Sequence, residues 1–265
     1  MSPTTNALAS TPNLPAAGRK LWLYTNYDCN LSCSYCVAYS TPRAPRRALG
    51  LETVQQAVDE AAELGFDEVF LTGGEPLILP DIYAMIAYAA ARLPVTVLTN
   101  AMLVKGTRLE KLRAVQHPNL RIQVSLDGAN AHQHEAYRGA GSWAPTIAGI
   151  LRLLEAGFHV RLSTTETPAN QDFLSDICTF HLALGIPEEN HFIRPLAKRG
   201  FATEGIHVGK ATLAPELTIN VDGVYWHPLS TDADMQVSAQ IFPLADAVQA
   251  ICAQIETQTP AQTFT

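Results

Sequence analysis

Three cysteines, Cys29, Cys33 and Cys36, occupy the short stretch DCNLSCSYC near the start of the chain. Thiolates at such close spacing can bind a metal, because they are the ligands of structural zinc ions and of iron–sulfur clusters. A disulfide framework is a weaker explanation, since the chain has five cysteines, an odd number, and three of them are crowded together. The stretch therefore predicts a metal site.

Two metal chemistries compete for this spacing. A structural zinc ion usually takes four Cys or His ligands in two pairs, and His117, His132 and His134 could supply the fourth. These histidines lie far along the chain, however, at no recognisable spacing. A cubane cluster held by three thiolates leaves one iron without a protein ligand, where a substrate or cofactor can bind and exchange electrons. The pattern favours such a cluster.

Strands and helices alternate along most of the chain. Apolar or alternating stretches predict strands at 20–25, 67–72, 94–100, 120–127, 158–165 and 190–196. Helical periodicity predicts helices at 51–65, 80–93, 107–116, 143–157 and 170–185. This order is typical of parallel strands joined by right-handed crossovers. Six strands are too few for a closed eight-stranded barrel, so the α/β fold is either a partial (β/α)6 barrel or an open twisted sheet.

Short polar motifs follow the first four predicted strands. The cysteine stretch follows the first, GGEP (73–76) the second, TNA (99–101) the third and SLDG (125–128) the fourth. The carboxyl ends of parallel strands lie at one rim, where ligands of α/β proteins bind. This rim is therefore the predicted active site.

The motifs of residues 20–202 resemble those of the radical S-adenosylmethionine (radical SAM) enzymes. The matching segments, in order, are C-x3-C-x2-C with Tyr35 before its last cysteine, LTGGEPLI, TNA, VSLDG, AYRGAGSW, ETPAN and RPLAKRGFA. The resemblance is closest to the SPASM-associated branch, which modifies peptides and natural products. It implies a partial barrel of parallel strands.

The same resemblance implies the cofactors and the reaction. Cys29, Cys33 and Cys36 would bind one 4Fe–4S cluster, whose open iron is chelated by S-adenosylmethionine. One electron from the reduced cluster, supplied by a flavodoxin or ferredoxin, would cleave the sulfonium. The resulting 5′-deoxyadenosyl radical would abstract a hydrogen atom from the substrate.

The resemblance also implies a set of S-adenosylmethionine-binding residues. They are Tyr35, Gly73, Gly74, Glu75, Pro76, Asn100, Ser125, Asp127, Arg138 and Leu196. The glycines would allow close backbone approach, Glu75 would face the methionyl ammonium, and Arg138 would bind the methionyl carboxylate.

The other members of this set have more general roles. Ser125 and Asp127, two apart on one strand, would share a face and bond ribose hydroxyls or the methionyl end. Leu196, and Tyr35 through its backbone, would lie near the adenine. Each residue also has a plain structural explanation, such as turn formation or a solvated surface charge.

The segment after residue 202 loses the strand–helix rhythm. Residues 214–230 predict a β-hairpin with its turn at Asp222–Gly223, and 243–258 predict a helix. The hairpin resembles the start of a SPASM extension, but His227 stands where that pattern usually has a cysteine. We therefore expect a single cluster and a degenerate extension over the barrel mouth. The expected domains are a disordered leader (1–18), a core (19–202) and the extension (203–265).

Cys178 and Cys252 both lie in apolar helical patterns. A buried structural thiol is the default interpretation of such a cysteine. The alternative is that one of them returns a hydrogen atom to a substrate radical, as in radical epimerases.

Composition limits the possible partners and location. The net charge of −7 and the pI near 5.6 argue against a nucleic-acid-binding face. The sequence shows no apolar run long enough to span a membrane and no secretory signal, so a cytoplasmic enzyme is expected.

Three functions remain open at this point. The first is a radical SAM enzyme that acts on a small metabolite or short peptide in a biosynthetic or tailoring pathway. The second is a peptide or protein modifier that works with a separate recognition partner. The third is a non-catalytic Fe–S or zinc scaffold or sensor.

Overall fold

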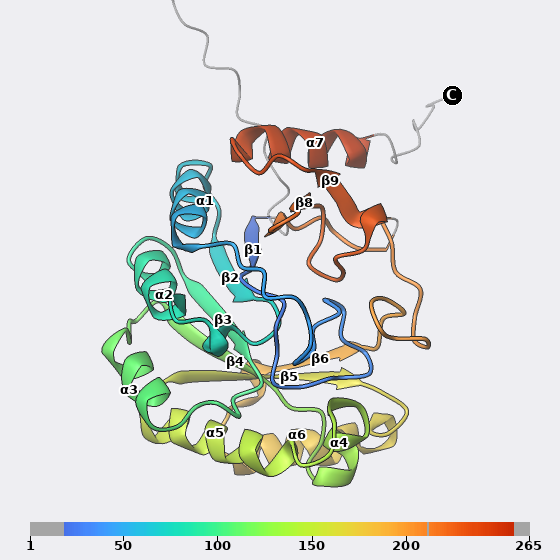
Figure 1. The fold of residues 1–265 in the computed structure, drawn as a ribbon. Helices are drawn as coiled ribbons and strands as arrows, with labels where there is room; N and C mark the ends of the chain where they lie inside the picture. The colour runs from blue at the N-terminus through green and yellow to red at the C-terminus, as the bar shows by residue number, and fades with distance from the viewer. Residues whose placement is uncertain (1–18, 211, 257–265) are drawn as a thin grey trace, which may run out of the picture.

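Six parallel strands form the main part of the molecule (Figure 1). The computed structural model describes residues 19–210 and 212–256; the leader predicted at 1–18 lies outside this range. The strands are β1 (Lys20–Tyr24), β2 (Glu68–Thr72), β3 (Val95–Thr99), β4 (Leu120–Ser125), β5 (His159–Glu166) and β6 (His191–Pro195). They pair in chain order, each parallel to the next. The predicted α/β class and the partial barrel of parallel strands are confirmed.

Helices follow the strands and cover the outer face of the curved sheet (Figure 1). They are α1 (Leu51–Glu63), α2 (Ile82–Ala90), α3 (Thr107–Ala114), α4 (Ala131–Arg138), α5 (Trp143–Glu155) and α6 (Leu174–Ala183). Single 3-10 turns occur at η2 (Pro76–Ile78), η3 (Gln171–Phe173), η4 (Glu188–Asn190) and η5 (Ala233–Met235). Helix α4 was not predicted, because its sequence AHQHEAYR is short and contains few apolar residues.

Alternate residues of a strand point to opposite faces of the sheet, one towards the helices and the other towards the inner face. Leu21 and Leu23 of β1 are fully buried in the apolar core that the sheet forms with the helices. Burial of each leucine contributes roughly 1.5–3 kcal/mol. Trp22, between them, points to the inner face and stacks on Phe70 of β2, with ring centroids 4.0 Å apart. Because one face of the sheet holds the core, the inner face is available for the site.

The C-terminal segment continues the same sheet beyond β1. Strand β7 (Thr218–Asn220) pairs parallel to β1, and β8 (Gly223–Tyr225) and β9 (Gln236–Ser238) add antiparallel strands. The hairpin predicted within 214–230 is present, with its turn at Val221–Asp222, one residue before the predicted Asp222–Gly223, whereas β9 was missed. At the hairpin turn Gly223 has φ of +130° and a Cβ would lie 2.1 Å from the Ser238 carbonyl oxygen, so only glycine suits the position.

Helix α7 (Leu244–Glu256), predicted at 243–258, closes the described part of the chain. It packs near α1, and the Leu244 N–H donates to the Glu60 carboxylate at 2.6 Å. The extension thus shares a sheet and a core with the barrel, and a domain boundary at residue 202 stays a prediction. No helix within 19–210 or 212–256 has the length and apolar character to cross a bilayer.

Candidate active site

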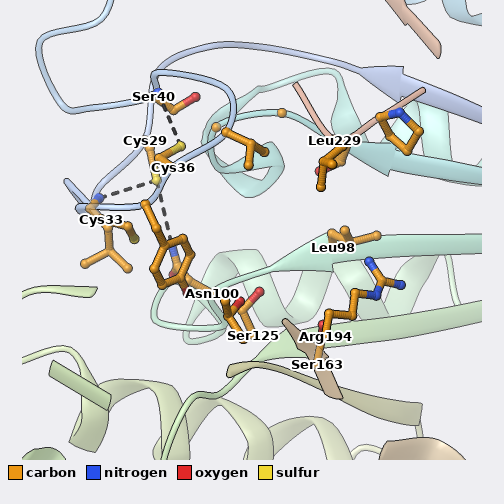
Figure 2. A pocket seen from close by; sticks show the side chains of 18 of the residues that line it. Cys29, Cys33, Cys36, Ser40, Leu98, Asn100, Ser125, Ser163, Arg194 and Leu229 are labelled. Atoms are coloured by element: carbon orange, nitrogen blue, oxygen red, sulfur yellow. Dashed lines mark hydrogen bonds between the residues drawn. The ribbon is translucent and has the colours of Figure 1, made fainter. Parts of the chain in front are cut away.

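A cavity of about 270 Å³ lies on the inner face of the sheet at the carboxyl ends of the strands (Figure 2). Of the residues predicted to bind the cluster or S-adenosylmethionine, its lining includes Cys29, Cys33, Tyr35, Cys36, Gly73, Gly74, Glu75, Asn100, Ser125, Arg138 and Leu196. Asp127 and Pro76 are buried behind this lining. The structure therefore brings the predicted rim together around one cavity.

The three cysteine side chains lie on one wall of the cavity (Figure 2). Backbone N–H groups of Leu31 and Ser40 donate to the sulfurs of Cys29 and Cys36, each at 3.4 Å. The Asn100 amide lies 3.9 Å from the Cys29 sulfur. Such donors stabilise negative charge on sulfur and tune the potential of a bound cluster.

The two metal chemistries place different demands on these thiols. In the described part of the chain, no three Cys, His, Asp or Glu side chains gather closely enough to hold one metal ion. A zinc ion requires every sulfur at about 2.3 Å. A cubane cluster instead bonds each thiolate to a different iron, so its ligands stand farther apart. Three thiols on one wall of a cavity are the donor set that a 4Fe–4S cluster with one open iron requires.

Burial raises the pKa of the Cys29 thiol to about 12 and that of Cys33 to about 11. Desolvation is the main cause in both cases, because it penalises the thiolate. Metal binding reverses this preference, since the ligand to the metal is the deprotonated sulfur.

The loop after β2 holds the cysteine stretch in place. The Gly74 N–H donates to the Asn26 carbonyl oxygen at 2.8 Å, and the Glu75 N–H donates to that of Asp28 at 3.0 Å. A Cβ on Gly74 would lie 2.1 Å from the Asp28 carbonyl oxygen. The sequence predicted that the glycine pair lets the backbone approach a ligand closely. In the structure, the close approach at Gly74 is to the backbone of the cysteine stretch. The Asn26 side chain, missed by the sequence analysis, donates to the Asp28 and Glu75 carbonyls.

Gly74→Ala should therefore displace the cysteine stretch. Because the clash is with backbone, we expect a loss of roughly 1–3 kcal/mol in the free energy of unfolding and incomplete cluster loading. Urea unfolding and iron analysis after anaerobic reconstitution measure both effects. Gly209→Ala is the control, since a Cβ there meets nothing within 4 Å. Equal iron and stability in the two variants would contradict this role of Gly74.

Two further elements contact the cysteine stretch. The Ser34 N–H donates to the Tyr137 carbonyl on α4 at 2.9 Å, and the Phe201 N–H donates to the Cys36 carbonyl at 3.1 Å. Gly200 has φ of +60°, and a Cβ there would lie 2.3 Å from the same Cys36 oxygen. The segment RPLAKRGFA, which follows the fifth crossover, thus packs its glycine against the third cysteine.

Glu75 ties the second and third strand ends together. Its buried carboxylate accepts hydrogen bonds from the Thr99 hydroxyl at 2.8 Å and from the backbone N–H groups of Asn100 and Leu77 at 2.9 and 3.1 Å. Burial raises the pKa of Glu75, while these donors oppose the rise. Glu75 is among the residues that line the cavity, and its contact with an ammonium group stays a prediction.

Asp127 anchors Tyr35 and Arg138 from behind the cavity wall. Its Oδ2 accepts the Tyr35 hydroxyl and the Arg138 Nε–H, the latter at 2.7 Å, and its Oδ1 accepts the Thr165 N–H at 2.9 Å. Asp127 is fully buried and does not line the cavity. The sequence analysis expected it to contact the cofactor directly, but its position makes it a positioning residue. Tyr35 was predicted to contact the adenine through its backbone, and the structure shows in addition that its hydroxyl donates to Asp127.

Arg138 lies on α4 with one side on Asp127 and the other lining the cavity. Burial alone lowers the pKa of Arg138, but the charge of Asp127 outweighs it and raises the pKa. The guanidinium also lies 5.5 Å from the centroid of the Tyr35 ring. Helix α4 begins at the Asn130 side chain, which accepts the Gln133 N–H at 3.1 Å, a capping signal that could have revealed it.

Cys178 and Cys252 lie away from the cavity. Cys178 is on α6 in the outer layer and Cys252 is on α7, where it packs against the apolar core. Neither lines the cavity. The structure gives no support to either cysteine as a hydrogen donor to a substrate radical, and favours the structural interpretation.

Two histidines are buried, His134 beside Asp127 and His181 on α6; the sequence had suggested His134 only as a possible zinc ligand. The Asp127 N–H donates to Nδ1 of His134, and His181 packs edge-on against His191. Burial is the main cause that lowers the pKa of both His134 and His181 to about 4. Both are therefore neutral in the folded protein at neutral pH.

These histidines should make the fold sensitive to acid. Their folded pKa lies below the unfolded value of about 6.5, so protonation favours unfolding and stability falls as pH drops from about 6.5 towards 4. Each pKa unit corresponds to about 1.4 kcal/mol. Urea unfolding at pH 7 and pH 5 should show the loss, and His181→Leu should reduce it. Exposed His132→Gln is the control, and a wild-type stability that does not change with pH contradicts the account.

The chain is similar in sequence to a known enzyme superfamily. The model of the radical SAM superfamily matches residues 23–169. The AdoMet-dependent heme synthase of Methanosarcina barkeri is 35% identical over 207 residues, 77% of this chain and 56% of that protein. The mycofactocin maturase MftC of Mycolicibacterium smegmatis is 30% identical over 183 residues, 68% of this chain and 46% of that protein. This chain thus spans about half the length of these curated relatives.

Among solved structures, Streptococcus suis SuiB bound to S-adenosylmethionine matches with a TM-score of 0.62 and 18% identity, over 76% of this chain and 46% of that one. This likeness shows the shared fold. Enzymes of the matched superfamily use a 4Fe–4S cluster and S-adenosylmethionine, for which the thiols of this cavity are a fitting donor set. From the match over residues 23–169 and the two curated relatives, the chain belongs to the radical SAM superfamily and is an enzyme.

Proposed function

We propose that this enzyme reductively cleaves S-adenosylmethionine at a single 4Fe–4S cluster bound by Cys29, Cys33 and Cys36, and acts on a small metabolite in a biosynthetic pathway. The observation that carries the proposal is the wall of three thiols in a cavity at the strand ends. When bound, the cluster and S-adenosylmethionine supply an electron and a 5′-deoxyadenosyl radical that abstracts hydrogen.

The chain's own residues bind and orient the methionyl end in this proposal. Arg138, held by Asp127, presents its guanidinium to the carboxylate, and Glu75 with the adjoining glycines faces the ammonium. With only three cysteine ligands, the cluster would have one iron free to bind the amino and carboxylate groups of S-adenosylmethionine. Fixing the arginine through a buried ion pair limits its motion, which favours one orientation of the sulfonium.

The opposite part of the cavity would hold the nucleoside and the substrate. Ser125 offers a hydroxyl at the end of β4, and Leu196 offers an apolar surface to the adenine. Apolar side chains, among them Leu98 and Leu229, also line the cavity (Figure 2). They would limit the access of water and of other hydrogen donors to a reactive radical.

A second candidate function is the modification of a peptide or protein with a separate recognition partner. The relation to a mycofactocin maturase favours it, while the relation to a heme synthase favours a non-peptide substrate. Both alternatives need an external electron donor, for which we propose a flavodoxin or ferredoxin.

The test is 5′-deoxyadenosine formation by the anaerobically reconstituted enzyme with dithionite and S-adenosylmethionine. We expect slow formation without substrate and faster formation with an extract fraction that contains the substrate. Stimulation by a low-mass fraction supports the metabolite, and stimulation only by a peptide fraction supports the second candidate. An iron-loaded enzyme that forms no 5′-deoxyadenosine in any fraction contradicts both.

A further inference from the structure

Arg194 of β6 is one of the cationic residues that line the cavity. Its side chain lines the cavity on the side of Leu98, across from the cysteines (Figure 2). Within the described residues its guanidinium forms no hydrogen bond or ion pair. The residue is solvent-accessible, yet the surrounding protein is sufficient for desolvation to lower the pKa of Arg194. A guanidinium in this setting has five N–H donors to satisfy.

Other arginines on the inner face differ from Arg194. Arg138 is paired with Asp127. Arg121 and Arg161 lie 3.4 and 3.6 Å from the same Glu68 carboxylate, and Arg161 also lies over the Phe192 ring. Each of these cations therefore has a carboxylate partner within the protein, although Arg121 and Arg161 share a single one, whereas Arg194 has none among the described residues.

The carboxylate that interacts electrostatically with Arg194 is already engaged. Glu216 accepts Lys20 Nζ at 2.9 Å and Trp22 Nε1 at 2.5 Å. It raises the pKa of Arg194 only as a minor influence, after desolvation. Since Lys20 balances Glu216, one positive charge remains at this end of the cavity.

His227 adds a neutral donor to the same lining. Its Nδ1 accepts the Leu229 N–H at 3.1 Å, so the ring hydrogen resides on Nε2. Burial lowers the pKa of His227 to about 4, which keeps the ring neutral at pH 7. His227 belongs to the C-terminal extension, whereas Arg194 belongs to the barrel, so the two parts of the chain meet at this point.

We propose that Arg194 and His227 form a substrate subsite for an oxyanion, a carboxylate or phosphate carried by an otherwise largely apolar small molecule. Leu98 and Leu229 would contact the apolar part of that molecule. With its anionic group at this end, the substrate would extend its C–H bonds towards the cysteine wall. The inference rests on the proposed function, because it names the substrate class of that reaction.

The experiment measures site-specific modification by phenylglyoxal, which reacts with accessible guanidinium groups. The reconstituted enzyme is labelled anaerobically, digested and analysed by mass spectrometry, with and without sodium butanoate, inorganic phosphate, S-adenosylmethionine or sodium chloride at matched ionic strength. Arg113, exposed on α3, is the internal control. The protection of Arg194 is measured first in the wild-type protein, so that result does not depend on whether a variant folds.

We expect millimolar butanoate or phosphate to slow modification of Arg194 by about twofold or more, the factor for a site at least half occupied, without slowing that of Arg113. The better protector distinguishes a carboxylate from a phosphate subsite. His227→Ala should weaken the protection.

Several results overturn the inference. The first is an Arg194 that phenylglyoxal does not modify. The second is that butanoate or phosphate protects Arg194 no more than chloride does, or protects Arg113 equally. The third is that His227→Ala leaves the protection of Arg194 unchanged. Protection by S-adenosylmethionine alone also overturns it, because Arg194 would then belong to the cofactor site. Labelling needs no turnover, so failure of protection and failure of S-adenosylmethionine cleavage are separate results.

Discussion

Cys33→Ala, and equally Cys29→Ala or Cys36→Ala, should abolish cluster binding and with it 5′-deoxyadenosine formation. The three sulfurs on the cavity wall are the proposed donor set, and a cubane held by two of them would be exposed to solvent and easily lost. We expect iron to fall from about four atoms per chain to a small fraction, with loss of the brown colour. Iron and sulfide analysis after anaerobic reconstitution measures the effect.

Cys178→Ala and Cys252→Ala are the matched controls, because both cysteines lie outside the cavity. Each should retain full iron content and cleave S-adenosylmethionine. If one of them retained cleavage but lost net substrate conversion, the hydrogen-donor hypothesis would return. Equal iron loss in all five variants would contradict the assignment of the cluster to residues 29–36.

The second large effect is expected for Asp127→Ala. The change leaves the Arg138 charge buried without its partner and removes the acceptor of the Tyr35 hydroxyl. Breaking a buried ion pair by removal of one partner costs about 3–5 kcal/mol, so the free energy of unfolding should fall by that amount. Urea unfolding followed by circular dichroism is the measurement.

Asp127→Asn should lose less, because the amide oxygen can still accept one of the hydrogen bonds. Tyr35→Phe, which removes a single donor to the same carboxylate, should cost only about 1 kcal/mol. The exposed Asp172→Ala on η3 is the surface control. An Asp127→Ala protein as stable as Asp172→Ala would show that the buried network does not support the site.

Much of the fold could be predicted from the sequence because parallel strands have a strong local signal. Strands such as EVFLT and VTVLT are apolar nearly throughout, as expected when both faces are buried, and amphipathic helices separate them. The elements that were missed lack such a signal. Helix α4 depends on the Asn130 cap and on packing, and β9 is three residues long.

The site could be predicted in its location but not in its contacts. Parallel topology places all strand ends at one rim, so motifs on four strands had to meet. Side-chain partners are a different matter, because Tyr35 and Asp127 are 92 positions apart and nothing local indicates their hydrogen bond. Whether Arg194 has a partner is likewise a property of the folded chain alone.

The proposed cleavage requires an iron atom that has no protein ligand and that binds S-adenosylmethionine. Electron–nuclear double resonance of the dithionite-reduced enzyme, with S-adenosylmethionine labelled with ¹⁵N at its amino group and ¹⁷O at its carboxylate, tests this most directly. We predict hyperfine coupling of both labels to the cluster, lost in the Cys33→Ala variant. A wild-type enzyme with a full cluster and no coupling to either label would contradict the account.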